Sequence, residues 1–273
     1  MKPMPALARQ RGLSLIELMI SITLGLLVIL AVTYVFAASR ASYRHQEALS
    51  NVQESGRMAL ELLTRDIRMA GHPGCGNLAF LDHRTPAEFS NAMVLSGVAN
   101  AAAVPDSISL TRGSAHPARL SAIAAANQIE LVDAAVLGNL VAGDRLLLTD
   151  CAFTEVVQVS ARLGNRVTTV APLTRQYGPG SFVMRLERVA YSVAGNELRR
   201  SVDGAPGQAV AGNIANMKLF YGIDSSGDRS VDSYVANPAN WAEVVAVRIN
   251  LSVTERDVTL PFSTTVALRN RVP

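Results

Sequence analysis

The first strong pattern in the chain is an uninterrupted apolar run near its start. Residues 18–39 carry no charged side chain over 22 positions. As a helix with a rise of 1.5 Å per residue, this run would be roughly 33 Å long, which matches the ~30 Å hydrocarbon core of a bilayer. The pattern therefore predicts one membrane-spanning helix.

Past the apolar run, the pattern becomes amphipathic. Apolar residues recur every three or four positions over residues 49–67, with charged residues between them, as on one face of a helix. No proline interrupts residues 13–70, whereas Gly71 is followed by Pro73 and Gly74. We therefore expect one continuous helix over residues 13–70 that ends at Gly71.

After Gly71 the apolar positions alternate, which is typical of strands separated by Gly, Asn, Pro and Asp turns. We expect strands over residues 107–110, 128–132, 145–149, 155–159, 166–170, 182–193, 198–202, 217–221, 244–253 and 258–266. Residues 82–126 are poorer in pattern and predict long connections with one or two short elements. The expected fold class is α+β, with the second half of the long helix packed on one mainly antiparallel β-sheet head.

Charge distribution gives the orientation. The formal net charge of +3 comes from Lys2, Arg9 and Arg11, and removing these leaves as many basic as acidic residues. The chain therefore has no basic footprint for nucleic acid, and we expect no such partner. Basic residues ahead of the apolar run predict that the amino terminus stays in the cytoplasm and that the chain after Arg40 is exported.

Just ahead of the apolar run, residues 11–17 read RGLSLIE. This heptapeptide resembles the class III signal of type IV prepilins. The resemblance implies that prepilin peptidase cuts between Gly12 and Leu13 and that Leu13 is then methylated. It also places Glu17 at the fifth position of the mature chain, where the family carries its membrane carboxylate.

Glu17 also has a physical explanation. A charged group in a spanning helix costs up to about 2.5–3.5 kcal/mol, so it is tolerated mainly beside a neutralising partner. The new α-amine of Leu13 is such a partner, because its ordinary pKa is about 7.7–8.0. The pair can form within one helix or between neighbouring subunits and would help to set their axial register. In the alternative interpretation, Glu17 meets only head groups and water.

Four further segments resemble landmarks of PilW-type minor pilins. They are residues 65–75, 143–151, 216–224 and 241–248. The resemblance implies a pilin-like fold and a minor pilin that helps to prime type IV pilus assembly and is incorporated at the tip of the fibre. The implied partners are prepilin peptidase, other minor pilins and the major pilin through the helix, and a tip adhesin.

On this interpretation the chain has four parts. They are a prepilin leader (1–12), a transmembrane half-helix (13–39), a periplasmic amphipathic half-helix (40–70) and a β-rich head (71–273). The protein would be a single-pass inner-membrane protein before it enters the fibre. The alternatives are a minor pseudopilin of a type II secretion system, of the related J type, and a membrane-tethered periplasmic binding protein or enzyme. The last alternative predicts a cut near Ala37 or none.

Two cysteines, Cys75 and Cys151, lie in the exported part. An oxidising compartment favours their pairing, so we expect one disulfide between them. Closing this loop would stabilise the fold by roughly 4 kcal/mol in the chain-entropy model. Two free thiols, or a zinc site that includes His72, are the alternatives.

Residues 224–232 place oxygen-bearing side chains at alternate positions, as calcium loops do. The candidate metal ligands are Asp224, Ser226, Asp228 and Asp232. Arg229 stands where an EF-hand-like loop has glycine, and Val235 where it has a bidentate glutamate. A plain Asp/Ser/Gly turn explains the same residues.

Catalytic motifs are absent from the sequence. It has no G-x-S-x-G elbow, no H-E-x-x-H helix and no Walker A loop, and its four histidines are scattered. We therefore expect a protein that is not an enzyme and that needs no cofactor other than the candidate calcium ion.

Overall fold

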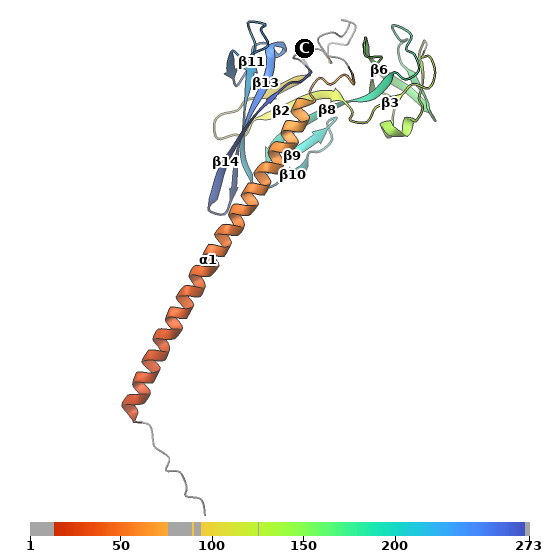
Figure 1. Cartoon of the computed structure of the whole chain (residues 1–273). Coiled ribbons are helices and arrows are strands. Elements are labelled where there is room, and N and C mark those ends of the chain that lie inside the picture. The colour runs from red at the N-terminus through yellow and green to blue at the C-terminus, as the bar shows by residue number, and fades with distance from the viewer. Residues whose placement is uncertain (1–13, 76–88, 90–93, 125, 271–273) are drawn as a thin grey trace, which may run out of the picture. The chain divides into compact units, whose positions relative to one another are not determined.

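The computed structural model describes residues 14–75, 89, 94–124 and 126–270 (Figure 1). The chain divides into two compact units, Met1–Ser50 and Asn51–Pro273. The second unit contains the end of the helix and all the strands that the structure describes. The predicted part boundaries at residues 39/40 and 70/71 stay predictions.

Helix α1 spans Leu15–Arg68, close to the predicted range of 13–70. Val52, Ala59, Leu63 and Ile67 are fully buried, which confirms the predicted apolar stripe. Gly71, just after α1, has the left-handed backbone conformation (φ 69°). Its N–H donates to the carbonyl oxygen of Thr111 at 2.8 Å. A side chain at this backbone angle would be strained, which explains why the chain turns away at a glycine.

The first sheet has ten strands, all paired antiparallel. They are β1 (Leu95–Val98), β2 (Ser107–Gly113), β3 (Ala118–Arg119), β4 (Gln128–Glu130), β5 (Arg145–Thr149), β6 (Thr154–Leu163), β7 (Arg166–Thr169), β8 (Phe182–Ala194), β9 (Glu197–Val202) and β10 (Gln208–Ala211). Their order is β1-β2-β8-β5-β6-β7-β4, with β3 and β9 also on β8, and β10 on β9. The long strand β8 therefore organises this sheet.

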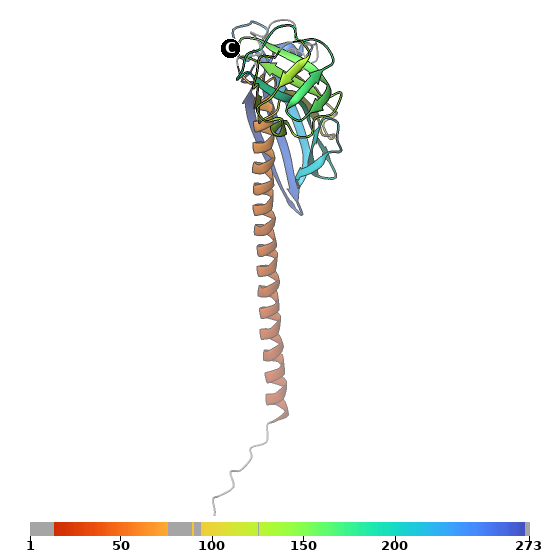
Figure 2. The same ribbon diagram turned by 90° about the vertical axis from the view of Figure 1, so that its right-hand side faces the viewer.

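The second sheet is a four-stranded antiparallel sheet in the order β12-β11-β13-β14. Its strands are β11 (Ile214–Ile223), β12 (Ser233–Val235), β13 (Val244–Glu255) and β14 (Val258–Ala267). They are drawn in blue and lie side by side in Figure 1 and Figure 2. Two short 3-10 helices, η3 (Ala134–Leu137) and η4 (Trp241–Glu243), complete the described elements.

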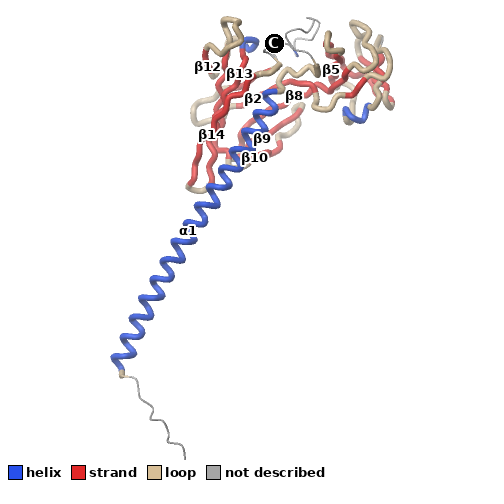
Figure 3. The backbone as a smooth tube through the Cα atoms, viewed as in Figure 1, coloured by secondary structure: helices blue, strands red, loops and turns tan. Residues whose placement is uncertain are grey.

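Every strand that the alternation predicts is present, and the α+β class is confirmed (Figure 3). The alternation gave no bounds for β1 and β3, which are short elements within residues 82–126 as expected there, and it did not indicate β10 or β12. These four strands are two to four residues long. Such short strands carry too few residues for an alternating pattern, and they form because a longer partner strand offers free backbone groups. The alternation predicted a mainly antiparallel head without giving the number of sheets, and the described strands form two.

Candidate functional site

The start of α1 is capped by Ser14. The N–H of Glu17 donates to the carbonyl oxygen of Ser14 at 3.1 Å and to its Oγ at 3.3 Å. Glu17 thus lies in the first helical turn, where the free N–H groups favour a negative charge. Gly12 and Leu13 lie outside the described residues, so the cut and the methylation stay predictions.

The apolar side chains of α1 in the unit Met1–Ser50 are not buried by other described residues of that unit. Its exposed large side chains are Leu15, Ile16, Leu18, Met19, Ile20, Ile22, Leu24, Leu26, Leu27, Val28, Ile29, Leu30, Val32, Tyr34, Val35 and Phe36. Ser21 and Thr33 donate their hydroxyls to carbonyl oxygens of the same helix, as polar groups do in lipid. This helix is long and apolar enough to cross a membrane.

A buried carboxylate ties the end of α1 to the first sheet. Asp66 accepts hydrogen bonds from Arg112 Nη1 at 2.7 Å, Tyr191 OH at 2.8 Å and Arg200 Nε at 2.9 Å. Asp66 is only 6% exposed. These four residues, here called the Asp66 cluster, join α1 to β2, β8 and β9. They fix the end of the helix against three neighbouring strands.

Electrostatics in the Asp66 cluster favour the charged carboxylate. Burial alone would raise the pKa of Asp66, but the hydrogen bond from Arg200 and the charge of Arg112 lower it below its ordinary value. Burial and the neighbouring carboxylate raise the pKa of the Tyr191 hydroxyl, which therefore stays protonated and donates. The cluster is an ionic contact around a charged carboxylate rather than an acid–base pair poised near neutral pH.

A second ionic contact joins the two sheets. Lys218 of β11 donates to the carboxylate of Asp106 at 2.9 Å and to the carbonyl oxygens of Asn100, Ala101 and Val104. Asp106 also accepts the N–H of Leu219 at 2.9 Å. Asp106 is 3% exposed, so this lysine holds the connection between β1 and β2 against the four-stranded sheet.

The predicted disulfide is confirmed. Cys75 and Cys151 are bonded, with their Cα atoms 5.0 Å apart, and no free cysteine remains in the chain. The bond ties the segment after α1 to the turn between β5 and β6. It thereby joins two of the four segments that resemble the PilW-type landmarks. The other two, residues 216–224 and 241–248, meet where β11 pairs with β13.

The loop at residues 224–232 is organised by its own carboxylates. Asp232 accepts the N–H groups of Ser225 and Ser226 at 2.7 and 3.1 Å. Asp228 accepts the N–H of Ser230 at 2.8 Å. Hydrogen bonds from Ser230 lower the pKa of Asp228, and those from Ser225 lower the pKa of Asp232. These contacts are what a capped turn provides.

Arg229 in the same loop has a left-handed backbone (φ 73°), the conformation for which an EF-hand-like loop uses glycine. Asp224 accepts the N–H of Arg229 at 2.8 Å, which helps to hold that conformation. Within the part of the chain that the structure describes, no group of three or more His, Cys, Asp or Glu side chains is arranged to hold a metal ion. Calcium binding by Asp224, Ser226, Asp228 and Asp232 stays a prediction.

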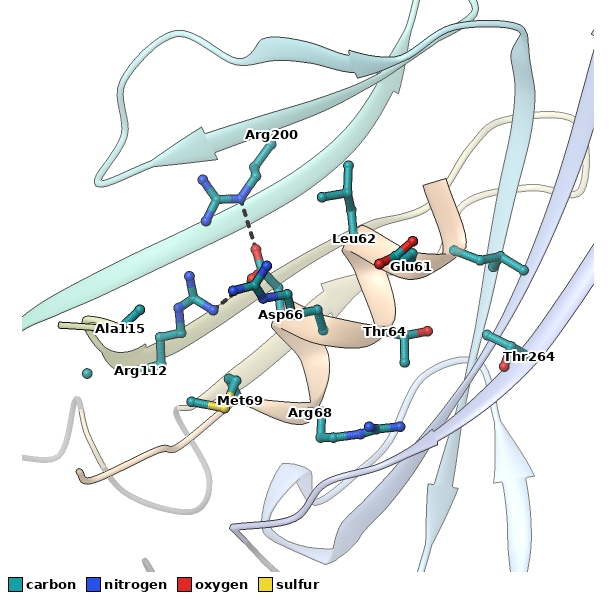
Figure 4. A pocket seen from close by; sticks show the side chains of 13 residues that line it. Glu61, Leu62, Thr64, Asp66, Arg68, Met69, Arg112, Ala115, Arg200 and Thr264 are labelled. Carbon is teal, nitrogen blue, oxygen red and sulfur yellow. Dashed lines mark hydrogen bonds and ion pairs between the residues drawn. The ribbon is translucent and has the colours of Figure 1, made fainter. Parts of the chain in front are cut away.

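One pocket of about 770 Å³ lies beside the Asp66 cluster. It is lined by Leu60, Glu61, Leu62, Thr64, Arg65, Asp66, Arg68, Met69, Arg112, Gly113, Ala115, Arg200 and Thr264. Figure 4 shows Arg112 and Arg200 on one side of the last turns of α1 and Thr264 on the other. The pocket thus lies over the helix, between β2 and β9 on one side and β14 on the other.

Sequence reasoning missed the Ser14 cap, the Asp66 cluster and the Lys218 contact. Asp66 did leave a signal, because it stands three residues after Leu63, on the stripe where α1 is otherwise apolar. A carboxylate at such a position is expected to find buried cations. Its partners Arg112 and Arg200, by contrast, lie far away in sequence and left no local signal.

Comparisons with known families agree with this arrangement. Residues 7–33 match the prokaryotic N-terminal methylation motif, and residues 188–270 match the family described as type IV Pilus-assembly protein W. No curated protein matches the chain. The first match covers the start of α1, and the second runs from β8 to the end of β14. Together with the helix and the sheets, the two matches support a pilin-like protein, similar to the PilW type, with a role in type IV pilus assembly.

Proposed function

We propose that this chain is a minor pilin that helps to prime type IV pilus assembly and is incorporated at the tip of the fibre. The observation that carries the proposal is the capped, uncovered apolar helix with Glu17 in its first turn, within a match to the methylation motif. A helix with this surface is suited to lipid before assembly and to neighbouring pilin helices afterwards.

In the proposed mechanism, the chain inserts with its amino terminus in the cytoplasm and its head in the periplasm. Prepilin peptidase cuts between Gly12 and Leu13, and Leu13 is methylated. The resulting cationic amine pairs with a Glu17 carboxylate, in the same helix or in a neighbour, so that entry into the fibre need not leave a charge unpaired in an apolar environment. The role is assembly with other minor pilins, the major pilin and a tip adhesin, rather than catalysis.

The first test is the mass of the intact protein and of its amino-terminal peptide, extracted from membranes of cells with and without prepilin peptidase. We expect a mature chain that begins at methylated Leu13 only when the peptidase is present. A chain that begins near Ala38, or one that retains Met1 in both strains, would contradict the proposal and favour a secreted or tethered binding protein.

The second test addresses Glu17. We expect Glu17→Ala to leave the cut intact but to reduce the amount of the protein in sheared fibres, because the amine then loses its partner. Glu54→Ala, which removes an exposed carboxylate further along α1, is the matched control and should incorporate normally. Normal incorporation of the Glu17 variant would remove the role proposed for this carboxylate.

The third test separates a pilus from a type II secretion system. Deleting the gene should reduce surface pili while secretion of exoproteins continues, and the protein should be found at fibre ends by immunogold labelling. Loss of exoprotein secretion with normal piliation would instead assign the chain to the pseudopilins.

A further inference from the structure

The pocket over the last turns of α1 carries an excess of positive charge. Its lining includes the guanidinium groups of Arg65, Arg68, Arg112 and Arg200, against the carboxylates of Glu61 and Asp66. Glu187 of β8 is not part of the lining, but its carboxylate lies 3.7 Å from Arg112 Nε. Even with this third carboxylate, the cations outnumber the anions in a concave site, where a field is focused.

The Asp66 cluster leaves donors unused. One carboxylate accepts from two guanidinium groups there, although each guanidinium has five N–H donors. Arg112 Nε is buried without a hydrogen-bond partner, and its 3.7 Å separation from Glu187 is too long for a hydrogen bond. That buried Nε is closed to a ligand, but the side chain of Arg200 is 26% exposed and has four N–H donors besides the Nε that it donates to Asp66, so the cluster has the capacity to hold a second carboxylate there.

Arg65 and Arg68 belong to the lining of the same pocket and are exposed. Neither forms an ion pair with any residue that the structure describes. Leu60, Leu62 and Met69 are half-buried in the lining between these charges. The pocket thus offers apolar surface and positive charge together, which favours an acidic segment that also carries apolar side chains.

From this geometry, we propose that the pocket receives an acidic segment of a neighbouring pilin subunit, with its carboxylates paired to Arg65, Arg68 and the Asp66 cluster. The proposal rests on the proposed function, because pilus assembly supplies the neighbour. A single-stranded nucleic acid is disfavoured as occupant, since the lining residues include no aromatic side chain on which bases could stack.

The test is photo-crosslinking in piliated cells. The full chain carries a benzophenone amino acid at Thr264, or in a second version at Ala115, both in the lining. Formation of the Cys75–Cys151 disulfide on a non-reducing gel verifies that each version folds. We expect a crosslink to another pilin, within a segment that holds at least two Asp or Glu residues, identified by mass spectrometry of the linked peptide.

Charge reversal then tests the pairing. Arg65→Glu combined with Arg68→Glu should lower the crosslink yield by about fivefold or more, because attraction becomes repulsion. Arg57→Glu, on the exposed part of α1 outside the lining, is the matched control and should change little. Reversal of the acidic residues in the linked segment should restore the yield with the double variant.

Several results would overturn the proposal. They include an unchanged yield with the double variant, a linked segment without carboxylates, and a link only to a second copy of this chain. The amino-terminal peptide is measured in the same cells. A chain that begins at Leu13 but gives no crosslink refutes the pocket while the proposed function stands. A chain that is never processed refutes both.

Discussion

The apolar part of α1 and the β-rich unit use similar residues in opposite ways. Leu27 is 64% exposed, whereas Leu63, in the same helix, is fully buried among residues of the second unit. Both regions are rich in Leu, Ile and Val, but only the second encloses them. Burial of apolar surface is the main stabilising term in water. The first region must therefore obtain its stabilisation from an outside environment, and the second from its own packing.

Polar groups differ between the regions in the same way. In the apolar run, Ser21 and Thr33 bond to carbonyl oxygens three or four residues away. In the second unit, Asp66 is held by groups from β2, β8 and β9. A helix that needs no distant partner for its polar groups keeps them paired in any apolar environment. A cluster made from three strands keeps its shape only while the unit is folded.

The largest effect is expected from Asp66→Ala. Removing this carboxylate leaves two guanidinium groups near each other without their counter-ion, so the free energy of unfolding should fall by about 3–5 kcal/mol. Trp241 is the only tryptophan, so its fluorescence reports unfolding of the second unit in detergent-solubilised protein. Glu61→Ala, an exposed change in the same turns of α1, should stay within about 0.5 kcal/mol of wild type. Equal effects of the two changes would show that burial does not distinguish these carboxylates.

The carboxylate of Asp66 should also make the stability of the second unit depend on pH in the acidic range. Because the pKa of Asp66 is lowered in the fold, its contribution to stability is fully present above the ordinary pKa of 3.8 and is lost as the pH falls through the lowered value. Asp66→Asn should remove this part of the acid-induced loss of stability. The check is urea unfolding at a series of pH values between neutral and strongly acidic.

The next largest effect is expected when Leu63 and Leu27 are each replaced by alanine. Leu63→Ala should lower the free energy of unfolding of the second unit by about 2–5 kcal/mol, because it leaves a cavity under α1. Leu27→Ala removes the same atoms from an exposed position and should leave that unfolding transition unchanged. We expect Leu27→Ala to act instead on membrane extraction or fibre incorporation. A clear shift of the Trp241 transition by Leu27→Ala would refute the contrast.

Loss of the disulfide should lower the free energy of unfolding somewhat less than Leu63→Ala does. Replacing both Cys75 and Cys151 by serine should lower the free energy of unfolding by about 2–4 kcal/mol, because the unfolded chain regains the conformational freedom that the disulfide removes. Wild-type protein treated with a reductant is the matched control, and it should unfold at nearly the same urea concentration as the double variant. If the reduced wild type keeps its full stability, the bond has no role in holding the second unit together.

The smallest effect involves His72. Burial, together with the charges of Arg269 and Arg112, lowers the pKa of His72 below its ordinary 6.5. The neutral ring is thus favoured in the fold, so stability is fully present above pH 6.5 and declines as the pH falls through the lowered value. His72→Gln should flatten the change in melting temperature between pH 7.5 and 5. His116→Gln, at an exposed position, should keep the wild-type slope.

Local pattern was sufficient for much of this fold. The period of α1, the alternation of the long strands and the stop at Gly71 all depend on residues close in sequence, and each prediction was confirmed. The pairing of Cys75 with Cys151 also followed, because the chain holds only these two cysteines. The processing residues Gly12 and Leu13 are likewise local, and a match to the methylation motif spans them.

Tertiary structure alone decided which charges meet. Asp66 lies 46 residues from Arg112 and 134 from Arg200, and Asp106 lies 112 from Lys218. The division of the strands into two sheets, and the pocket between β9 and β14, depend on the same long-range contacts. A local pattern reports which face of an element is apolar. Which elements then share a core is decided by packing and burial, which involve the whole chain at once.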